Sequence, residues 1–235
     1  MDRSGAAGAL GRPDESGEVL DAYDELGAHL GIRSREEVHE HGFWHRVFHC
    51  LVVARRDGVP VAVLQLRHPN KRAFPGLLDI SAAGHLHAGE RPEDGIRELH
   101  EELGLDIAFS DLTPIGERRL VDTQGEGVNR EIIHVYLTRD DRLLTEYRPQ
   151  RSEVTGLFDA NLRELVRLVA GSLDQMSVSG VIVDDDGALQ PVSRTITRFD
   201  LVPDVDDYLI EVLTRAQRFI PAEPGSEPDR RARRR

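Results

Sequence analysis

The chain has 235 residues, of which 39% are hydrophobic and 31% charged, which is enough for one sizeable core and too little for two domains of ordinary size. The formal net charge is -12, so the surface as a whole offers no electrostatic footprint for a nucleic acid polymer or an anionic membrane. Cys50 is the single cysteine, which excludes an internal disulfide, and no apolar run approaches the roughly 20 residues that span a bilayer.

Both ends of the chain are predicted to be disordered tails. Residues 1–17 consist mostly of Gly, Pro, Ser and charged side chains, without the charged-then-apolar design of a secretion signal. Residues 221–235 have a similar composition and end in RRARRR, which we interpret as a solubilising basic tail because the chain is acidic overall. The sequence therefore predicts a cytoplasmic protein with its folded region between two tails.

A β-hairpin is predicted early in the folded region. Residues 45–56 and 59–68 are apolar and β-branched, and the Asp57-Gly58 pair between them is a strong turn signal. The stretch LLDISAAG, at residues 77–84, follows as a predicted strand that leads into a glycine loop.

The segment RPEDGIRELHEELG, at residues 91–104, is predicted to be a helix. Pro92 suits the first helical position and Gly104 suits the helix end. Gly95 lies inside this helix, where glycine costs up to about 1 kcal/mol relative to alanine. A glycine at such a position indicates close packing against a neighbour.

Further strands and helices are predicted in the second half of the chain. Strands are expected over 113–121, 130–138 and 154–158, helices over 160–170 and 204–219, and a hairpin turning at Asp186 and Gly187. The last helix has an apolar stripe formed by Val205, Leu209, Val212, Ala216 and Phe219. Mixed strands with helices on their faces indicate an α+β fold of sandwich character.

Three carboxylates occupy one face of the helix at 91–104. Glu98, Glu101 and Glu102 stand at i, i+3 and i+4, so their side chains are near neighbours. Like charges at these spacings cost roughly 0.2 to 0.5 kcal/mol per pair in an isolated helix. The face is therefore either a solvated acidic surface or a platform for a cation.

Residues 84–105, GHLHAGERPEDGIRELHEELGL, resemble the Nudix box, which is a glycine, five residues, a glutamate, seven residues, and then REUxEExGU with U a bulky aliphatic residue. Gly84 and Glu90 hold the first spacing, but only six residues separate Glu90 from Arg97. The residues that match the second half are Arg97, Glu98, Leu99, Glu101, Glu102, Gly104 and Leu105. The ISAAGHL approach and the shortened entry to the helix resemble the branch of the family related to isopentenyl-diphosphate isomerase.

The resemblance implies a Nudix-type α/β/α sandwich with a mixed sheet, extended by a C-terminal hairpin and helix. We expect a hydrolase domain at 18–172, an extension packed on it at 173–220, and the two tails. The loop at 121–131, VDTQGEGVNRE, is the expected determinant of substrate choice.

The resemblance also implies a metal site with Glu98, Glu101, Glu102 and Gly84 as ligands and Arg97 as a catalytic residue. Hard cations such as Mg²⁺, with Mn²⁺ as the alternative, prefer carboxylate oxygens and leave coordination positions for substrate phosphates. Such an ion stabilises the charge of a diphosphate and activates water for attack. The mutual repulsion of the three carboxylates then favours cation binding.

Glu131 shares the strand parity of the apolar residues Ile133 and Val135. The resemblance implies that an acid on such a strand is a further candidate ligand or base. We expect it at the sheet edge, facing the catalytic cleft, with an ordinary strand-end charge as the alternative. Arg130 is interpreted as a surface arginine rather than a phosphate contact.

Histidines are concentrated in HEHGFWHRVFH, at residues 39–49. His45 and His85 resemble positions where the isomerases carry metal-binding histidines, although cysteine partners and an HExxH motif are lacking. We interpret them as structural histidines, with metal binding as the alternative, and Trp44 as a packing residue.

The expected activity is Mg²⁺-dependent hydrolysis of a diphosphate linkage in a nucleoside diphosphate derivative or a related organic diphosphate. The expected partner is a small-molecule diphosphate, and a homodimer is compatible with the sequence. The alternatives are an isomerase or a non-catalytic sensor of nucleotides or sugar phosphates. The resemblance implies that the isomerase reaction needs a cysteine in the strand before the box. This chain has Ser81, Ala82 and Ala83 there.

Overall fold

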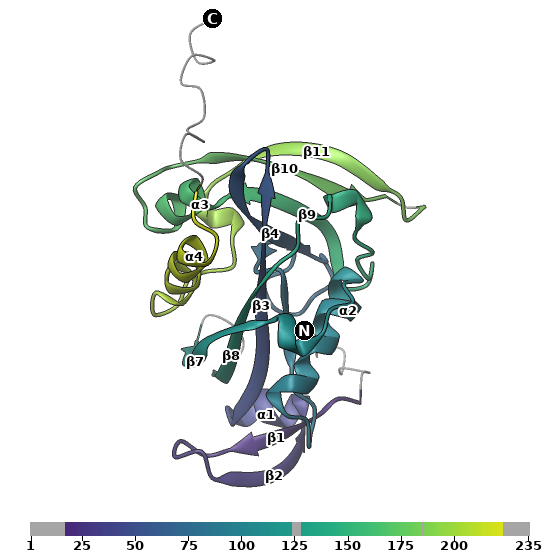
Figure 1. Ribbon diagram of the computed structural model, residues 1–235. Helices are drawn as coiled ribbons and strands as arrows, with labels where there is room; N and C mark the ends of the chain where they lie inside the picture. The colour runs from purple at the N-terminus through teal and green to yellow at the C-terminus, as the bar shows by residue number, and fades with distance from the viewer. Residues whose placement is uncertain (1–16, 124–127, 185, 223–235) are drawn as a thin grey trace, which may run out of the picture.

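The computed structural model describes residues 17–123, 128–184 and 186–222 (Figure 1). The predicted tails lie outside the described residues apart from positions 17, 221 and 222, and so does the centre of the loop predicted to select the substrate. None of the helices in the described part of the chain combines the length and apolar character that a membrane span requires.

The described chain forms strands and mostly short helices. The strands are β1 (Val19–Tyr23), β2 (His29–Ser34), β3 (Trp44–Arg56), β4 (Val59–Arg67), β5 (Leu78–Asp79), β6 (Ala82–His85), β7 (Thr113–Asp122), β8 (Asn129–Arg139), β9 (Val154–Asn161), β10 (Met176–Val183) and β11 (Leu189–Ile196). The α-helices are α1 (Arg35–His41), α2 (Arg97–Leu103), α3 (Leu162–Val169) and α4 (Tyr208–Phe219). The 3₁₀ helices are η1 (Pro92–Ile96), η2 (Phe109–Asp111), η3 (Leu144–Glu146) and η4 (Arg198–Asp200).

Strand β3 is the centre of the sheet. It runs parallel to β8 and antiparallel to β4 and β6, so the sheet is mixed as predicted. The predicted hairpin joins β3 to β4, with Asp57 and Gly58 at positive φ of 50° and 80°, as expected for an Asp-Gly hairpin turn.

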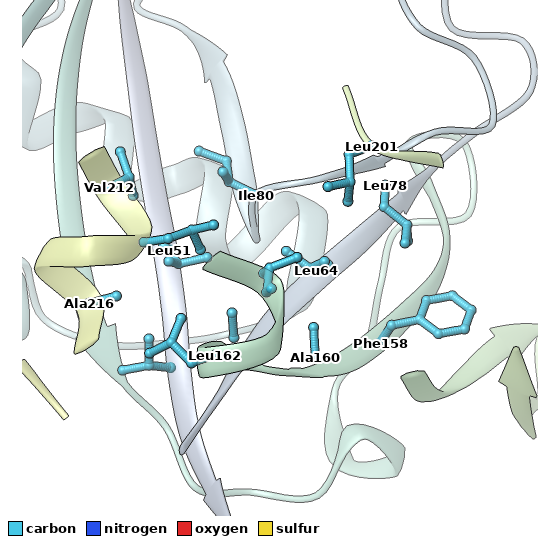
Figure 2. Packing of buried hydrophobic residues seen from close by; sticks show 14 of the residues in the cluster. Leu51, Leu64, Leu78, Ile80, Phe158, Ala160, Leu162, Leu201, Val212 and Ala216 are labelled. Atoms are coloured by element: carbon cyan, nitrogen blue, oxygen red, sulfur yellow. The ribbon is translucent and has the colours of Figure 1, made fainter. Parts of the chain in front are cut away.

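The two faces of β3 are buried against different layers, because successive side chains of a strand point to opposite faces. Leu51 and Val53 contribute to the hydrophobic cluster that also contains residues of α3 and α4 (Figure 2). Phe48 and Cys50 contribute to the cluster that contains Leu99 and Leu103 of α2. Burial on both faces explains the nearly continuous apolar run in this strand and confirms the α/β/α sandwich.

The C-terminal hairpin and helix continue the same structure. β10 pairs with β9 and β11 pairs with β10, while Gly187 has φ of 86° in the predicted turn. Helix α4 packs beside α3 on one side of the sheet (Figure 1). The hairpin therefore adds two strands to the central sheet.

The predicted apolar stripe of the last helix is partly wrong. Leu209 is only partly buried and Phe219 is 37% exposed, whereas the buried positions are Tyr208, Val212, Leu213 and Ala216. Asp206 and Asp207 have positive φ, so the helix starts at Tyr208 rather than at 204 and presents a face rotated from the predicted one.

The N-terminal elements β1, β2 and α1 were not predicted from the sequence. Ser34 caps α1 by accepting from the backbone of Glu37, and the Glu37 carboxylate accepts from the backbone of Ser34 in return. This capping box was present in the sequence as Ser-Arg-Glu-Glu, a recognised helix start.

Replacing Gly95 in η1 with alanine should destabilise the fold. A Cβ at this position would lie 2.5 Å from Cβ and 2.7 Å from Cγ of Phe48. Overpacking of this kind costs typically about 1 to 3 kcal/mol. Urea unfolding of Gly95→Ala should therefore show a lower midpoint, whereas Glu93→Ala on the exposed side of η1 should stay within about 0.5 kcal/mol of the parent. An unchanged midpoint for Gly95→Ala would mean that Phe48 can move aside.

Candidate functional site

The site begins where β3 and β4 separate. Ser81 sits between the two strands, where its Oγ accepts from Val52 N at 2.7 Å and donates to Val63 O at 2.5 Å. The predicted strand at 77–84 is therefore divided into β5, which pairs with β4, and β6, which pairs with β3. The gap between β4 and β6 is the place where the carboxylates of α2 enter.

Helix α2 follows η1 and ends at Gly104, which has φ of 63°. Gly104 confirms the predicted helix end, although the predicted single helix is divided into a 3₁₀ turn and an α-helix. Leu99 and Leu103 are buried against β3, and this orientation turns Glu98 and Glu102 toward β6 and β4.

Glu102 is almost completely buried, with 3% of its surface exposed. Its Oε2 accepts from the backbone N of Ala83 at 2.9 Å and from Nε2 of Gln65 at 3.0 Å. Burial, followed by the charge of Glu98, raises the pKa of Glu102 to about 8. Two neighbouring carboxylates that disfavour each other's ionisation form a site where a bound cation would stabilise both negative charges.

Glu98 is buried beside Gly84 of β6. A Cβ at Gly84 would lie 2.1 Å from the carboxylate carbon of Glu98, so only glycine leaves room for this carboxylate. Burial raises the pKa of Glu98, against the opposing charge of Arg97. Glu101 is the exposed member of the three, with 46% of its side chain accessible.

Arg97 connects the carboxylates of residues 90–102, which we call the acidic segment. Its guanidinium donates to Glu90 at 3.0 Å, Glu98 at 2.5 Å and Glu101 at 3.1 Å, and to the backbone oxygen of His85 at 2.7 Å. The Glu90–Arg97 pair forms although the connecting segment is one residue shorter than the general pattern. The 3₁₀ helix η1 explains this, because it rises about 2.0 Å per residue instead of about 1.5 Å.

The carboxylates line a groove of about 1870 Å³. It reaches from the loop after β4, which contributes Lys71 and Arg72, to the start of α4 at Tyr208. A volume larger than the roughly 300 to 1,000 Å³ of ordinary ligand pockets leaves room for groups on both sides of a diphosphate.

Glu131 lines the same groove from β8. The expected position at the sheet edge is wrong, because β8 lies between β3 and β7, and Glu131 is near the start of this internal strand. It is paired in register with His45 and accepts from Nδ2 of Asn129 at 2.7 Å. Arg130 donates to the backbone oxygen of Gly42 at 2.6 Å, which ties it to the end of α1.

Three histidines from different elements meet beside the carboxylates. His39 of α1, His45 of β3 and His85 of β6 have ring nitrogens that all lie within 4.8 Å of one another. Each Nδ1 has a partner: Arg35 O for His39 at 2.7 Å, Phe43 O for His45 at 3.2 Å and a Glu18 carboxylate for His85 at 3.1 Å.

The Nε2 atoms of this histidine cluster are the atoms left for a ligand. Nε2 of His45 is buried and has no hydrogen-bond partner within the described residues. Burial and the two neighbouring histidines hold the pKa of His45 well below its ordinary value. Neutral imidazoles whose Nδ1 atoms are held by carbonyl or carboxylate oxygens fit a divalent metal ion. Sequence reasoning missed His39, because its place in the cluster depends on how α1 packs on the sheet.

Trp44 is a packing residue as predicted, 8% exposed, with the Arg119 guanidinium 5.2 Å from its ring centroid.

Cys50 is fully buried on the face of β3 that packs on α2, and burial raises the pKa of its thiol. The described lining residues of the groove include no cysteine, whereas the isomerase alternative is expected to need one.

Comparisons with known proteins agree with this geometry. The family model of the NUDIX domain matches residues 43–170. A relative from Clostridium acetobutylicum, named as an uncharacterised Nudix hydrolase, is 39% identical over 79% of this chain and 90% of its own length. An isopentenyl-diphosphate delta-isomerase of Corynebacterium diphtheriae is 30% identical over 65% of this chain and 83% of its own. A crystal structure of a Deinococcus radiodurans protein shares the fold, with a TM-score of 0.54 at 19% identity, over 85% of this chain and 99% of that one.

Proposed function

The chain belongs to the Nudix family, and we propose that it is a pyrophosphohydrolase that cleaves the diphosphate linkage of a nucleoside diphosphate derivative or a related organic diphosphate. The observation that carries the proposal is the burial of Glu98 and Glu102 together beside a large open groove. A purely structural role would not favour two adjacent buried carboxylates with raised pKa values.

We assign the metal site to Glu98, Glu101, Glu102 and the backbone oxygen of Gly84, with Glu131 of the same groove as a further member. Oxygen donors of this kind suit Mg²⁺, with Mn²⁺ as the alternative. A divalent ion at this site supplies charge stabilisation for the diphosphate and makes water a better nucleophile. Glu131 acts as an additional ligand or as the base that accepts a proton from the attacking water.

Arg97 is assigned a positioning role. Its guanidinium donates hydrogen bonds to the acidic segment and to the backbone of β6. Its positive charge therefore offsets the repulsion among Glu90, Glu98 and Glu101. The carboxylates are thereby held in one arrangement before the ion binds, which reduces reorganisation during the reaction.

The histidine cluster is assigned to a second divalent ion. Imidazole nitrogens suit transition metals such as Zn²⁺ or Fe²⁺ better than Mg²⁺. Glu131, in register with His45, lines the groove together with His39 and His85 and would complete a mixed nitrogen and oxygen site. A cytoplasmic location and a homodimer remain predictions.

The proposed function is tested by following the release of phosphate monoesters and of inorganic phosphate. The purified chain would be assayed with Mg²⁺ or Mn²⁺ on nucleoside diphosphate sugars, dinucleoside polyphosphates and isopentenyl diphosphate. Hydrolysis of one class with release of a monophosphate supports the proposal. Isomerisation of isopentenyl diphosphate without phosphate release would support the isomerase, and metal-independent binding without turnover would support a sensor.

The stability of the metal-free protein should fall as the pH rises from about 5 to about 8. Glu102 has its pKa raised from an ordinary value of 4.5 to about 8, so between these values the folded state holds a proton that the unfolded state releases. Stability gained from that proton is present at low pH and is lost as the pH rises through the folded-state pKa. Glu98 contributes in the same direction.

Mg²⁺ binding should show the opposite trend, because the ion binds the ionised carboxylates. Thermal melts across this pH range, with and without Mg²⁺, would measure both effects, and the Mg²⁺-induced rise in Tm should grow with pH. Turnover should likewise increase from neutral to mildly alkaline pH. A Mg²⁺-induced rise that is largest near pH 5 would contradict the assignment of Glu102 as a ligand.

A further inference from the structure

The start of helix α4 contacts strand β3 in the lining of the groove. The hydroxyl of Tyr208 lies 2.8 Å from Nδ1 of His49, and the two rings are 5.6 Å apart in an edge arrangement. Both residues line the groove that also contains Glu98 and Glu102. A residue that is remote in sequence from the acidic segment, and outside the matched family region, therefore forms part of the wall.

The Tyr208–His49 contact determines the tautomer of the histidine. Tyr208 is 9% exposed, and burial raises the pKa of its phenol well above the ordinary value, so the hydroxyl keeps its hydrogen. A buried hydroxyl hydrogen needs an acceptor, and Nδ1 of His49 is the one recorded for it within the described residues. Nδ1 therefore accepts, and the hydrogen of the neutral imidazole is on Nε2.

His49 Nε2 has no hydrogen-bond partner among the described residues, and the side chain borders the groove. The neutral ring is consistent with the pKa of His49, which burial lowers. His49 therefore offers one uncharged N–H donor to whatever occupies the groove.

The position of this donor separates it from the carboxylates of α2. His49 is in register with Ala83, whose backbone N donates to Glu102, so it lies across β6 from the carboxylate of that residue. The groove lining near Tyr208 combines the apolar residues Leu78, Leu201 and Val205 with the carboxylates of Asp79, Glu131 and Asp204. The charge that acts most strongly on His49 is that of Glu131, followed by Asp79, which is paired with Arg67 at 2.9 Å.

A wall of apolar and acidic side chains with one neutral donor does not suit a phosphate group, which needs compensating positive charge. It suits an uncharged organic group that carries an oxygen, because a few well-placed polar groups give such a group orientation and specificity. The diphosphate would then lie at the carboxylates and the organic group against α4.

We propose that His49, held in one tautomer by Tyr208, donates a hydrogen bond to a hydroxyl or carbonyl oxygen of the organic group attached to the diphosphate. The inference rests on the proposed hydrolase function and adds a substrate class to it: diphosphates whose organic group carries an uncharged oxygen near the cleaved linkage. His49 touches the substrate in this assignment, and Tyr208 is a positioning residue that acts through His49.

The test compares two substrates in the full chain with Mg²⁺. UDP-glucose has hydroxyl oxygens in its organic groups, whereas the hydrocarbon group of geranyl diphosphate has none. Removing one hydrogen bond should cost about three- to tenfold in KM. Tyr208→Phe should therefore raise KM for UDP-glucose with little change in kcat, and should leave KM for geranyl diphosphate unchanged.

Two further variants separate this role from a structural one. His49→Gln keeps an N–H donor near the position of Nε2 and should retain the parent KM, whereas His49→Leu should raise KM as Tyr208→Phe does. Tyr136→Phe removes a hydroxyl on the other face of the sheet, which packs on Phe48, and should leave both substrates unaffected. Equal KM changes for both substrates in Tyr208→Phe would overturn the proposal.

The tautomer is measured separately by NMR of isotope-labelled imidazole nitrogens. The parent should show hydrogen on Nε2 of His49 and an unprotonated Nδ1, and Tyr208→Phe should lose this preference. Hydrogen on Nδ1 in the parent would overturn the proposal even if the chain is an active hydrolase. Absence of hydrolysis with any substrate class, combined with the expected tautomer and a shift of the Nε2–H signal on adding UDP-glucose, would refute the hydrolase function and leave the binding role in place.

Discussion

Glu102→Gln should reduce turnover by roughly 10²- to 10³-fold while leaving the metal-free protein at least as stable as the parent. The reduction corresponds to losing about 3 to 4 kcal/mol of charge stabilisation in the transition state. The substitution preserves size and helix tendency. It therefore separates a catalytic role of this carboxylate from a structural one.

The contacts of Glu102 explain why the fold should tolerate glutamine. The oxygen of a glutamine side chain can accept from Ala83 N as Oε2 of Glu102 does at 2.9 Å, and Gln65 can rotate its own amide to pair with the new one. Burial disfavours the charge of Glu102, and Glu98 adds like-charge repulsion. A neutral side chain removes both costs at pH values where Glu102 would be ionised.

Thermal melts with and without Mg²⁺ would test this prediction beside the hydrolysis assay. A ligand at ten times its dissociation constant stabilises the folded state by roughly 1.4 kcal/mol, and Glu102→Gln should gain much less. Glu93→Gln, which removes an exposed carboxylate of η1, is the matched control and should behave as the parent. If Glu102→Gln kept both its Mg²⁺-induced stabilisation and most of its turnover, the carboxylates of α2 would not be the metal site.

The sequence predicted those parts of the fold that depend on local patterns. The Asp57-Gly58 turn specifies the β3–β4 hairpin through its own backbone preferences. The spacing of Glu98 and Glu102 specifies that they share a face of α2, and both are indeed buried together beside β6. These are short-range properties, so one chain segment contains all the information they need.

The parts that failed depend on contacts between distant segments. The division of the strand at 77–84 follows from Ser81 bonding to both β3 and β4, and the sequence gives no sign of that insertion. His39 joins the histidine cluster because β1, β2 and α1 pack at one end of β3 (Figure 1). Tyr208 reaches His49 across 159 positions of sequence, although its helix was predicted.

Replacing Gly84 with alanine should impair metal binding and turnover more than stability. The added Cβ would lie 2.1 Å from both Cδ and Oε1 of Glu98, a distance that real side chains do not tolerate. Glu98 must then move out of its place beside β6, because the β6 backbone is paired with β3 and cannot retreat. Displacing one ligand should lower turnover by about 10²-fold, comparable to removing its charge.

The stability change in Gly84→Ala should be small because burial raises the pKa of Glu98, so a Glu98 side chain that turns toward the groove regains solvation. Gly89→Ala is the control within the same segment: its φ of 83° strains an alanine, but a Cβ there meets no atom within 4 Å. Gly89→Ala should thus lose stability without losing the Mg²⁺ response. Gly84→Ala with full turnover would show that Glu98 can be displaced without consequence, which would remove Glu98 from the proposed ligands and leave the site to Glu101, Glu102 and Glu131.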